Sequence, residues 1–265
     1  MKYTLGFIGC GNMGGALVRA AAASVAPDRI AVTDLDSKKA NALANELCVV
    51  ATDAGTLVEN AEFIVLGVKP QVMDTTLGTV APLLASREKV VLVTMAAGLS
   101  MNAIRAFAKG DYPVIRIMPN TPASLGKGMI LYTTEGVSTE DENAFLEAFR
   151  GAGVFDKLPE DKIDAASALS GCGPAFVYAF AEALADGAVK CGIPRDKALL
   201  YTAQTLLGSA EMLLKHGHPG DLKDAVCSPG GTTIAGIHAL EKAGLRSAAM
   251  DAVEAAYLRT LELKK

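Results

Sequence analysis

The stretch GFIGCGNMGG, residues 6–15, decides how the rest of the chain is interpreted. It closes a short apolar run and places Gly9, Gly11 and Gly14 at G-x-G-x-x-G spacing, directly before the alanine-rich segment 16–23. Strand, tight turn and helix in this order are typical of a dinucleotide-binding unit. Its glycines permit the turn, the approach of a pyrophosphate and close helix–strand packing. The alternative, a glycine-rich turn without a ligand, is less favoured because both flanking elements are present.

The start of the helix after this turn is expected to bind the phosphates. Free N–H groups and the positive end of the helix dipole meet at a helix N-terminus. The cofactor contacts expected in this stretch are Ile8, Gly9, Cys10, Gly11, Asn12, Met13 and Gly14.

An acidic residue follows the second predicted strand, Arg29 to Thr33. This residue, Asp34, lies twenty positions after the last glycine of the motif, where a carboxylate can bind both ribose hydroxyls of adenosine and so favours NADH. Asp34 or Asp36 can also cap the predicted helix Ser37 to Leu47. Lys38–Lys39 open that helix and are able to reach a 2′-phosphate, so both NADH and NADPH remain candidates.

Three further apolar runs, residues 63–68, 90–95 and 114–118, predict strands of a parallel sheet covered on both faces. Residues that follow such strands lie at the carboxyl edge of the sheet, where ligands bind. These residues are Lys69 and Pro70, then Ala96, Ala97 and Gly98, then Asn120 and Thr121. A helix is expected from Thr139 to Phe149, with Thr139 and Glu142 as a capping box.

Strand-like apolar runs stop near Pro159, and the pattern after this residue predicts helices alone. We therefore expect an α/β Rossmann N-terminal domain, residues 1–158, followed by an all-α C-terminal dimerisation and substrate domain, residues 159–265. The later helices are apolar over more than one face, more than a bundle of about 100 residues usually hides. We expect a homodimer in which a second copy of the chain covers these apolar faces, and a compact monomeric bundle is the alternative.

Composition excludes several classes of function. The net charge of −4, without a long basic run, gives no reason to expect nucleic acid or an anionic membrane as a partner. We expect no membrane-spanning helix, because no apolar run reaches the roughly 18 residues that cross a bilayer. Five cysteines without a C-x-x-C pair indicate a reducing cytoplasm, and three histidines without H-E-x-x-H predict no metal site.

A second glycine stretch, Ser228 to Thr233, predicts a turn followed by the start of a helix. Free amides and hydroxyls there are suited to a small carboxylate. An ordinary capped turn is the alternative, since Ser and Thr are common N-caps. The chain shows no catalytic triad, metal motif or P-loop, and no histidine or lysine lies in a proton-donor context. This favours a substrate that needs little acid catalysis, such as an already protonated imine.

Six blocks, in this order, resemble the pyrroline-5-carboxylate reductase family nearly end to end. The blocks are FIGCGNMG (7–14), GVKPQ (67–71), AAG (96–98), RIMPNTP (116–122), LSGCGPAF (169–176) and DAVCSPGGTTIAGIHALE (224–241). The resemblance implies NAD(P)H-dependent reduction of 1-pyrroline-5-carboxylate to L-proline. It also implies a helical domain that interleaves with its twin, and dimers that often assemble into a decamer.

The resemblance assigns roles to individual residues. Thr233 matches the threonine that hydrogen-bonds the ring nitrogen or relays its proton, and Val226 matches a residue that lines the ring. The implied contacts of the substrate carboxylate are Ser228, Gly230, Gly231, Thr232 and Thr233. The implied further cofactor contacts are Gly67, Val68, Lys69, Pro70, Met95, Ala96 and Ala97.

Two positions depart from the family pattern. Asp34 falls where members often carry a small polar residue or an Asn-Arg pair suited to phosphate, so the usual preference for NADPH is in question. Ala54 lies near a position often held by an asparagine that contacts adenosine.

Two other functions are considered. A related reductase acting on a β-hydroxyacid or another imine typically uses a lysine on the interdomain helix, and residues 170–176 contain none. A dinucleotide-sensing or scaffold protein without turnover would have no need of Ser228–Thr233.

Overall fold

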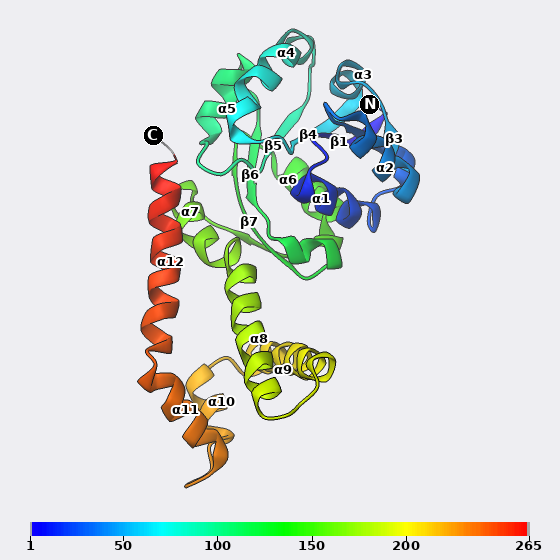
Figure 1. Ribbon diagram of the computed structural model, residues 1–265. Helices are drawn as coiled ribbons and strands as arrows, with labels where there is room; N and C mark the ends of the chain where they lie inside the picture. The colour runs from blue at the N-terminus through cyan, green and yellow to red at the C-terminus, as the bar shows by residue number, and fades with distance from the viewer. Residues whose placement is uncertain (1, 264–265) are drawn as a thin grey trace. The chain divides into compact units, whose positions relative to one another are not determined.

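The computed structural model describes residues 2–263, and an eight-stranded sheet occupies its N-terminal part (Figure 1). The strands are β1 (Tyr3–Ile8), β2 (Ile30–Thr33), β3 (Val50–Ala51), β4 (Ala61–Leu66), β5 (Val91–Thr94), β6 (Val114–Met118), β7 (Gly128–Glu135) and β8 (Gly153–Lys157). Their order across the sheet is β3-β2-β1-β4-β5-β6-β7-β8. β1 to β6 are parallel to one another, and β7 is antiparallel to β6.

The strand order reverses between β1 and β4, which pair in parallel in the register Phe7 with Val65. In open α/β sheets ligands bind outside the carboxyl ends of the strands at such a reversal. Gly9 follows β1 at this place and Gly67 follows β4, so the topology brings two predicted cofactor segments together. The Rossmann fold expected for the N-terminal part is confirmed.

Helices cover both faces of the sheet. They are α1 (Asn12–Ala22), α2 (Ser37–Leu47), α3 (Ala54–Asn60), α4 (Met73–Ala85), α5 (Met101–Ala108), α6 (Thr139–Ala148) and α7 (Glu160–Ser170), with short 3-10 turns η1 (Pro27–Arg29), η2 (Pro70–Val72), η3 (Thr121–Leu125) and η4 (Arg150–Ala152). Alternate strand residues face two separate apolar cores. Phe7 and Phe63 join the core that contains Leu17 and Phe145, while Ile64 joins the other core.

Side-chain caps fix where several of these helices begin. The side chain of Asp36 accepts from the Lys38 amide, so Asp36 is the N-cap of α2. The predicted capping box Thr139–Glu142 is wrong by one residue, because Ser138 is the N-cap of α6 and its hydroxyl accepts from the Asp141 amide. Glu142 instead binds Tyr132 and Lys157, so tertiary contacts decide its role.

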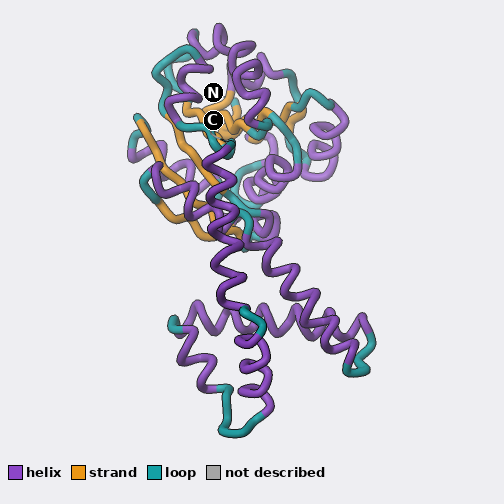
Figure 2. Tube along the Cα trace, turned by 60° about the vertical axis from the view of Figure 1, so that its left-hand side comes forward, coloured by secondary structure: helices purple, strands orange, loops and turns teal. Residues whose placement is uncertain are grey.

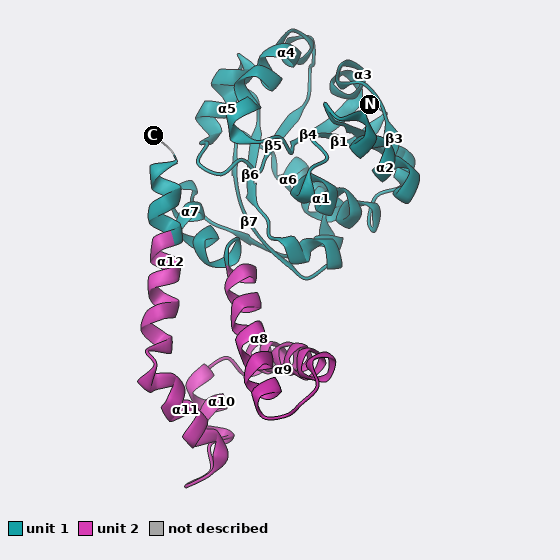
Figure 3. Cartoon of the chain, viewed as in Figure 1, with its two compact units in different colours: residues 1–172, 256–265 teal, residues 173–255 magenta. Residues whose placement is uncertain are grey.

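The chain divides into two compact units, residues 1–172 with 256–265, and residues 173–255 (Figure 3). Among the described residues all strands belong to the first unit, and Figure 2 shows the remainder as helices and loops. The helices that follow α7 are α8 (Gly173–Lys190), α9 (Arg195–His216), α10 (Pro219–Ala225), α11 (Thr232–Lys242) and α12 (Leu245–Glu262). The all-helical C-terminal part is confirmed, while a boundary at residue 158 stays a prediction.

The helices of the second unit expose large apolar side chains. Tyr178 is 62% exposed, Leu214 88% and Met250 66%, whereas Ala185 and Ala198 are among the few buried residues. Such faces are typical of helices that a partner covers.

One sequence expectation about membranes needs correction. By length and composition only, the described helical run Glu160–Lys190 is long and apolar enough to cross a bilayer, since it contains an 18-residue window with mean hydropathy 1.3. A break at Gly171 interrupts this run, which hid its length in the sequence. Length and composition alone are weak support for a span, because core helices of soluble proteins can share them.

Candidate functional site

Three glycines meet at the carboxyl ends of β1 and β4. Gly9 has φ +104°, which favours glycine. A Cβ on Gly14 would lie 2.2 Å from the carbonyl oxygen of Gly9, and one on Gly67 would lie 2.5 Å from the same oxygen. The backbones of the turn, α1 and the end of β4 are therefore in direct contact, and no side chain fits between them.

Gly11 differs from these three glycines. A Cβ on Gly11 would meet nothing within 4 Å among the described residues, so the surface in front of it is open. Gly11 is the N-cap of α1, and no described side chain caps the first turn of that helix. The first-turn amides of α1, at Asn12 and Met13, therefore face outward with the positive end of the helix dipole, which fits the phosphates of a dinucleotide.

The side chain of Asp34 is held by the backbone. Its Oδ2 accepts from the Cys10 amide at 2.6 Å, and its Oδ1 accepts from the Asp36 amide at 2.9 Å. Each carboxylate oxygen keeps a further lone pair for a ribose hydroxyl. Of the two roles considered for this acidic pair, the cap of α2 belongs to Asp36, while Asp34 lies against the glycine turn and its contact with ribose stays a prediction.

Two hollows lie beside the pair formed by Cys10 and Asp34. One, of about 320 Å³, is lined by Asp34, Ser37 and Asp53 among others, and its wall contains carboxylates and hydroxyls. The other, of about 310 Å³, is lined by Gly11 and Lys39 together with Arg19, whose guanidinium is bound to Glu46. The structure thus separates an acidic hollow from a basic one.

Cys10 is buried in the turn and has no described disulfide partner. Burial, and then the negative charge of Asp34, raise the pKa of its thiol to about 12. The thiol is therefore neutral at physiological pH and acts as a small apolar side chain in the turn.

The other predicted cofactor contacts follow β4 and β5. Lys69 is exposed and precedes Pro70, the first residue of η2, while Val68 packs against the apolar core. After β5, Ala96 is buried and Ala97 is exposed. The Ala96 amide donates to the hydroxyl of buried Thr94 at 3.3 Å, which fixes the first bend of the loop.

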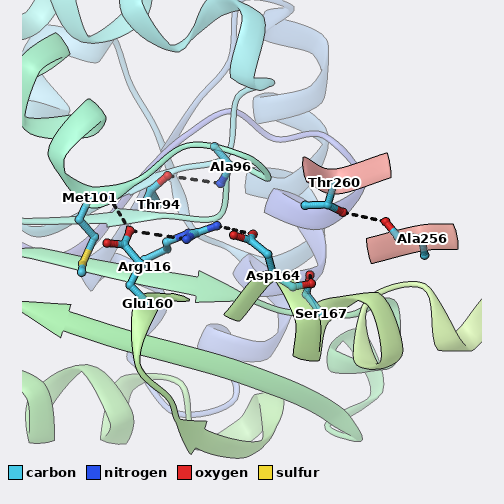
Figure 4. A network of polar contacts seen from close by, with 9 residues as sticks. All are labelled: Thr94, Ala96, Met101, Arg116, Glu160, Asp164, Ser167, Ala256 and Thr260. Carbon is cyan, nitrogen blue, oxygen red and sulfur yellow. Dashed lines mark hydrogen bonds and ion pairs between the residues drawn. The ribbon is translucent and has the colours of Figure 1, made fainter. Parts of the chain in front are cut away.

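A buried ionic network beneath this loop was not predicted from the sequence (Figure 4). Arg116 of β6 is 1% exposed, and its Nη2 lies 2.6 Å from Oδ1 of Asp164 on α7. Its Nη1 lies 3.5 Å from Oε1 of Glu160, which also accepts from the Met101 amide at 2.8 Å. An arginine within an otherwise apolar strand was the one signal in the sequence that pointed to it.

The second glycine stretch forms the expected turn. The Gly231 amide donates to the carbonyl of Ser228 at 3.0 Å, and Gly230 has φ +70°, as in a type II turn that carries proline at its second position. Gly231 is the N-cap of α11, and no described side chain caps that helix. The ordinary capped turn is therefore not what the structure contains, and Thr232 and Thr233 are exposed at an open helix start.

Val226 lies at the end of α10 and is 63% exposed. It lines a hollow of about 560 Å³ with Met212 and Leu222, among others. The glycine turn after β1 and the stretch Ser228–Thr233 belong to different compact units. No cluster of three or more potential metal ligands occurs among the described residues.

A Rossmann sheet with an open glycine turn is typical of NAD(P)-binding proteins, and helices with exposed apolar faces are typical of a dimerisation domain. Comparisons with known proteins specify the family. Residues 160–263 match the model of pyrroline-5-carboxylate reductase dimerisation, and residues 4–98 match the model described as NADP oxidoreductase, coenzyme F420-dependent.

Full-length relatives agree with these two matches. The chain is 41% identical to pyrroline-5-carboxylate reductase of Glycine max, covering 99% of this chain and 96% of that one, and 37% identical to that of Escherichia coli K12, covering 100% of each. A structure of the enzyme from Coxiella burnetii superposes with TM-score 0.89 at 31% identity, covering 100% of each chain. One from Plasmodium falciparum with NADP bound gives 0.87 at 30%, covering 99% and 98%.

The chain belongs to the pyrroline-5-carboxylate reductase family. It is an NAD(P)H-dependent oxidoreductase of proline biosynthesis. The alternatives of a β-hydroxyacid reductase and of a scaffold without turnover are therefore set aside.

Proposed function

We propose that this chain reduces 1-pyrroline-5-carboxylate to L-proline by using two open helix starts, one for each ligand. The dinucleotide phosphates bind the first turn of α1, and the substrate carboxylate binds the first turn of α11. The observation that carries the proposal is that both helices begin at a glycine N-cap without a side-chain cap among the described residues. Each leaves first-turn N–H groups and the positive end of a helix dipole for an anion.

The cofactor is held along the carboxyl edge of the sheet. Gly9, Cys10, Gly11, Asn12, Met13 and Gly14, with Ile8 before them, form the phosphate turn. Gly67, Val68, Lys69 and Pro70 follow β4, and Met95, Ala96 and Ala97 follow β5. The small side chains of the last group leave room for the nicotinamide ring. When bound, the reduced dinucleotide supplies a hydride to the carbon of the protonated imine.

The substrate is oriented by residues of the second compact unit. Ser228, Gly230, Gly231 and Thr232 surround the carboxylate, Val226 lies against the ring, and Thr233 hydrogen-bonds the ring nitrogen or relays its proton. Because the imine already carries its proton, the residues mainly supply proximity and orientation, worth about 7–11 kcal/mol in well-oriented reactions.

Asp34 favours NADH over NADPH. Its carboxylate is fixed by two backbone amides, so it does not swing away from the ribose. A 2′-phosphate beside it would place like charges close together. At 4 Å this repulsion is about 4 kcal/mol per pair of unit charges near a protein surface, and exposure of the half-buried Asp34 reduces it. Lys38 and Lys39 offset part of it, so NADPH is the weaker substrate rather than an excluded one.

The dimerisation domain of the family implies a homodimer, and the exposed apolar faces of α8, α9 and α12 support it. We propose a decamer of five such dimers as the larger assembly, which light scattering during size-exclusion chromatography would measure. We also propose a cytoplasmic location, because all five cysteines are free thiols. The proposal that neither nucleic acid nor an anionic membrane is a partner is supported by the net charge of −4 without a long basic run.

Two substitutions of Thr233 test the substrate site. Thr233→Val keeps the branched shape and removes the hydroxyl, whereas Thr233→Ser keeps the hydroxyl. We expect the valine variant to lose about 100-fold in kcat, the scale of a lost proton-transfer partner, with an unchanged Kd for NADH. The serine variant should retain most of the activity. Equal kcat for the valine variant and the unaltered enzyme would refute the role of Thr233.

A further inference from the structure

Helix α7 is fastened at three points along its length to other elements of the first compact unit, namely α5, β6 and the segment after β6. Glu160 in its first turn accepts from the Met101 amide, Asp164 pairs with Arg116, and the carbonyl of Ser170 at its last residue accepts from Asn120 Nδ2 at 2.9 Å. All the elements involved belong to the first compact unit. We call these contacts the α7 anchor.

Two contacts of the anchor, those made by Glu160 and Asp164, lie next to the loop that follows β5, as Figure 4 shows. That loop, residues 95–100, joins buried Thr94 to Met101, the first residue of α5. Ser100 caps α5 locally by accepting from the Ala103 amide, and the Met101 amide is taken by Glu160, 59 residues away in the sequence. A carboxylate at a helix N-terminus is favourable in the field of the helix dipole.

The buried position of Arg116 and Asp164 indicates a role other than stabilising the fold. Arg116 and Asp164 have side chains that are each 2% exposed, and desolvating such a pair commonly offsets its attraction. What the network does supply is a fixed geometry, since Arg116 ties Glu160 and Asp164 to one strand and Glu160 reaches on to the loop.

We infer that Glu160 is a positioning residue for hydride transfer. Its hydrogen bond from the Met101 amide fixes the position of the loop 95–100, on which the nicotinamide ring lies. The inference rests on the proposed function, which puts the ring on this loop. It assigns a catalytic consequence to helix α7.

The test separates the hydrogen bond from the charge. Glu160→Gln keeps an acceptor at the same reach and removes the charge, while Glu160→Asp keeps the charge and shortens the reach by one methylene. Asp161→Ala is the matched control, because Asp161 lies in the same helix turn with a side chain 70% exposed. For each variant we would measure kcat, the KM for NADH and for 1-pyrroline-5-carboxylate, and the Kd of ADP-ribose, which lacks nicotinamide.

We expect Glu160→Asp to lower kcat about tenfold, since small misplacements of a reacting group are costly. Its KM for NADH and its Kd for ADP-ribose should stay unchanged. Slower hydride transfer should also raise the deuterium isotope effect on kcat measured with NADH deuterated at C4. Glu160→Gln and Asp161→Ala should retain most of the activity. If Glu160 acts in stability alone, Glu160→Asp will lower the urea midpoint and leave kcat and the isotope effect unchanged, and this result would overturn the inference. A Glu160→Gln variant as slow as Glu160→Asp would also overturn it.

A further variant separates failure of this inference from failure of the proposed function. Ala97→Leu places a bulky side chain on the exposed surface of the loop, where the ring is expected. If it leaves kcat unchanged, the ring does not lie on this loop and both statements fail. If it lowers kcat while Glu160→Asp does not, the inference about Glu160 alone is overturned.

Discussion

Glycine-to-alanine substitutions in the first turn separate effects on folding stability from effects on cofactor binding. Gly14→Ala should lower stability, and Gly11→Ala should lower cofactor affinity. At Gly14 a new Cβ would lie 2.2 Å from a backbone oxygen, whereas ordinary contacts begin near 3.4 Å, so about 1.2 Å must be opened between α1 and the turn. Overpacking of this kind costs up to about 3 kcal/mol. The better helix propensity of alanine returns about 1 kcal/mol, which leaves a net loss of about 2 kcal/mol.

Gly11→Ala should behave in the opposite way. Its Cβ meets no described atom within 4 Å, and its φ of −68° suits alanine, so only the weaker capping of alanine lowers stability, by about 0.5 kcal/mol. The methyl group occupies the surface where a phosphate approaches. We expect at least a tenfold loss in NADH affinity, about 1.4 kcal/mol.

The assay is a fluorescence titration of NADH combined with urea unfolding at fixed protein concentration. Gly78→Ala, in the interior of α4 with open space at its Cβ, is the control and should gain about 0.5–1 kcal/mol without any change in affinity. Unchanged NADH affinity of Gly11→Ala would show that this glycine does not face the phosphates. A Gly14→Ala variant as stable as the original chain would refute the packing argument.

Other predictions concern charge and chemical reactivity. Asp34→Ser should raise the ratio of kcat/KM for NADPH to that for NADH by about tenfold or more, and an unchanged ratio would mean that Asp34 only supports the turn. The hydrogen bond from Lys157, followed by that from Tyr132, lowers the pKa of Glu142 below 4.5. The contribution of Glu142 to stability is therefore present above that pH and is lost as the pH falls through the lower pKa of the folded state. Glu142→Gln should flatten the decline of the urea midpoint at acid pH, and an unchanged decline would contradict the assignment. At pH 8 a thiol of pKa about 12 is ionised to about one part in ten thousand, so iodoacetamide should label exposed Cys48 well before Cys10 in a peptide mass map, and equal labelling would contradict the buried state of Cys10.

Local patterns in the sequence predicted the parts of the structure that local forces determine. The glycine spacing gave the turn after β1, and the helix Ser37–Leu47 has the predicted bounds because Asp36 caps it. The shift of the cap from Thr139 to Ser138 shows the limit of that approach, since two adjacent hydroxyl residues fit the same pattern and Glu142 is taken by Lys157.

Long-range polar contacts were beyond sequence reasoning. Arg116 is a charged residue in an otherwise apolar strand, yet its partners lie 44 and 48 residues away, and neither spacing nor composition selects them. The hydrogen bond from the Met101 amide to Glu160 could not be predicted for the same reason, and Ser100 already matched the local pattern of an N-cap for α5. The substrate stretch was recognisable only through its resemblance, since Ser228–Thr233 alone reads as an ordinary capped turn.

The central claim is that two open helix starts serve one reaction, one at α1 for the cofactor and one at α11 for the substrate. A crystal structure of the full-length enzyme with NAD⁺ and L-proline tests it most directly. We expect the pyrophosphate on the amides of Asn12 and Met13, the proline carboxylate on those of Thr232 and Thr233, and nicotinamide C4 about 3–3.5 Å from the ring carbon that loses hydride. A proline carboxylate bound away from the start of α11 would contradict it.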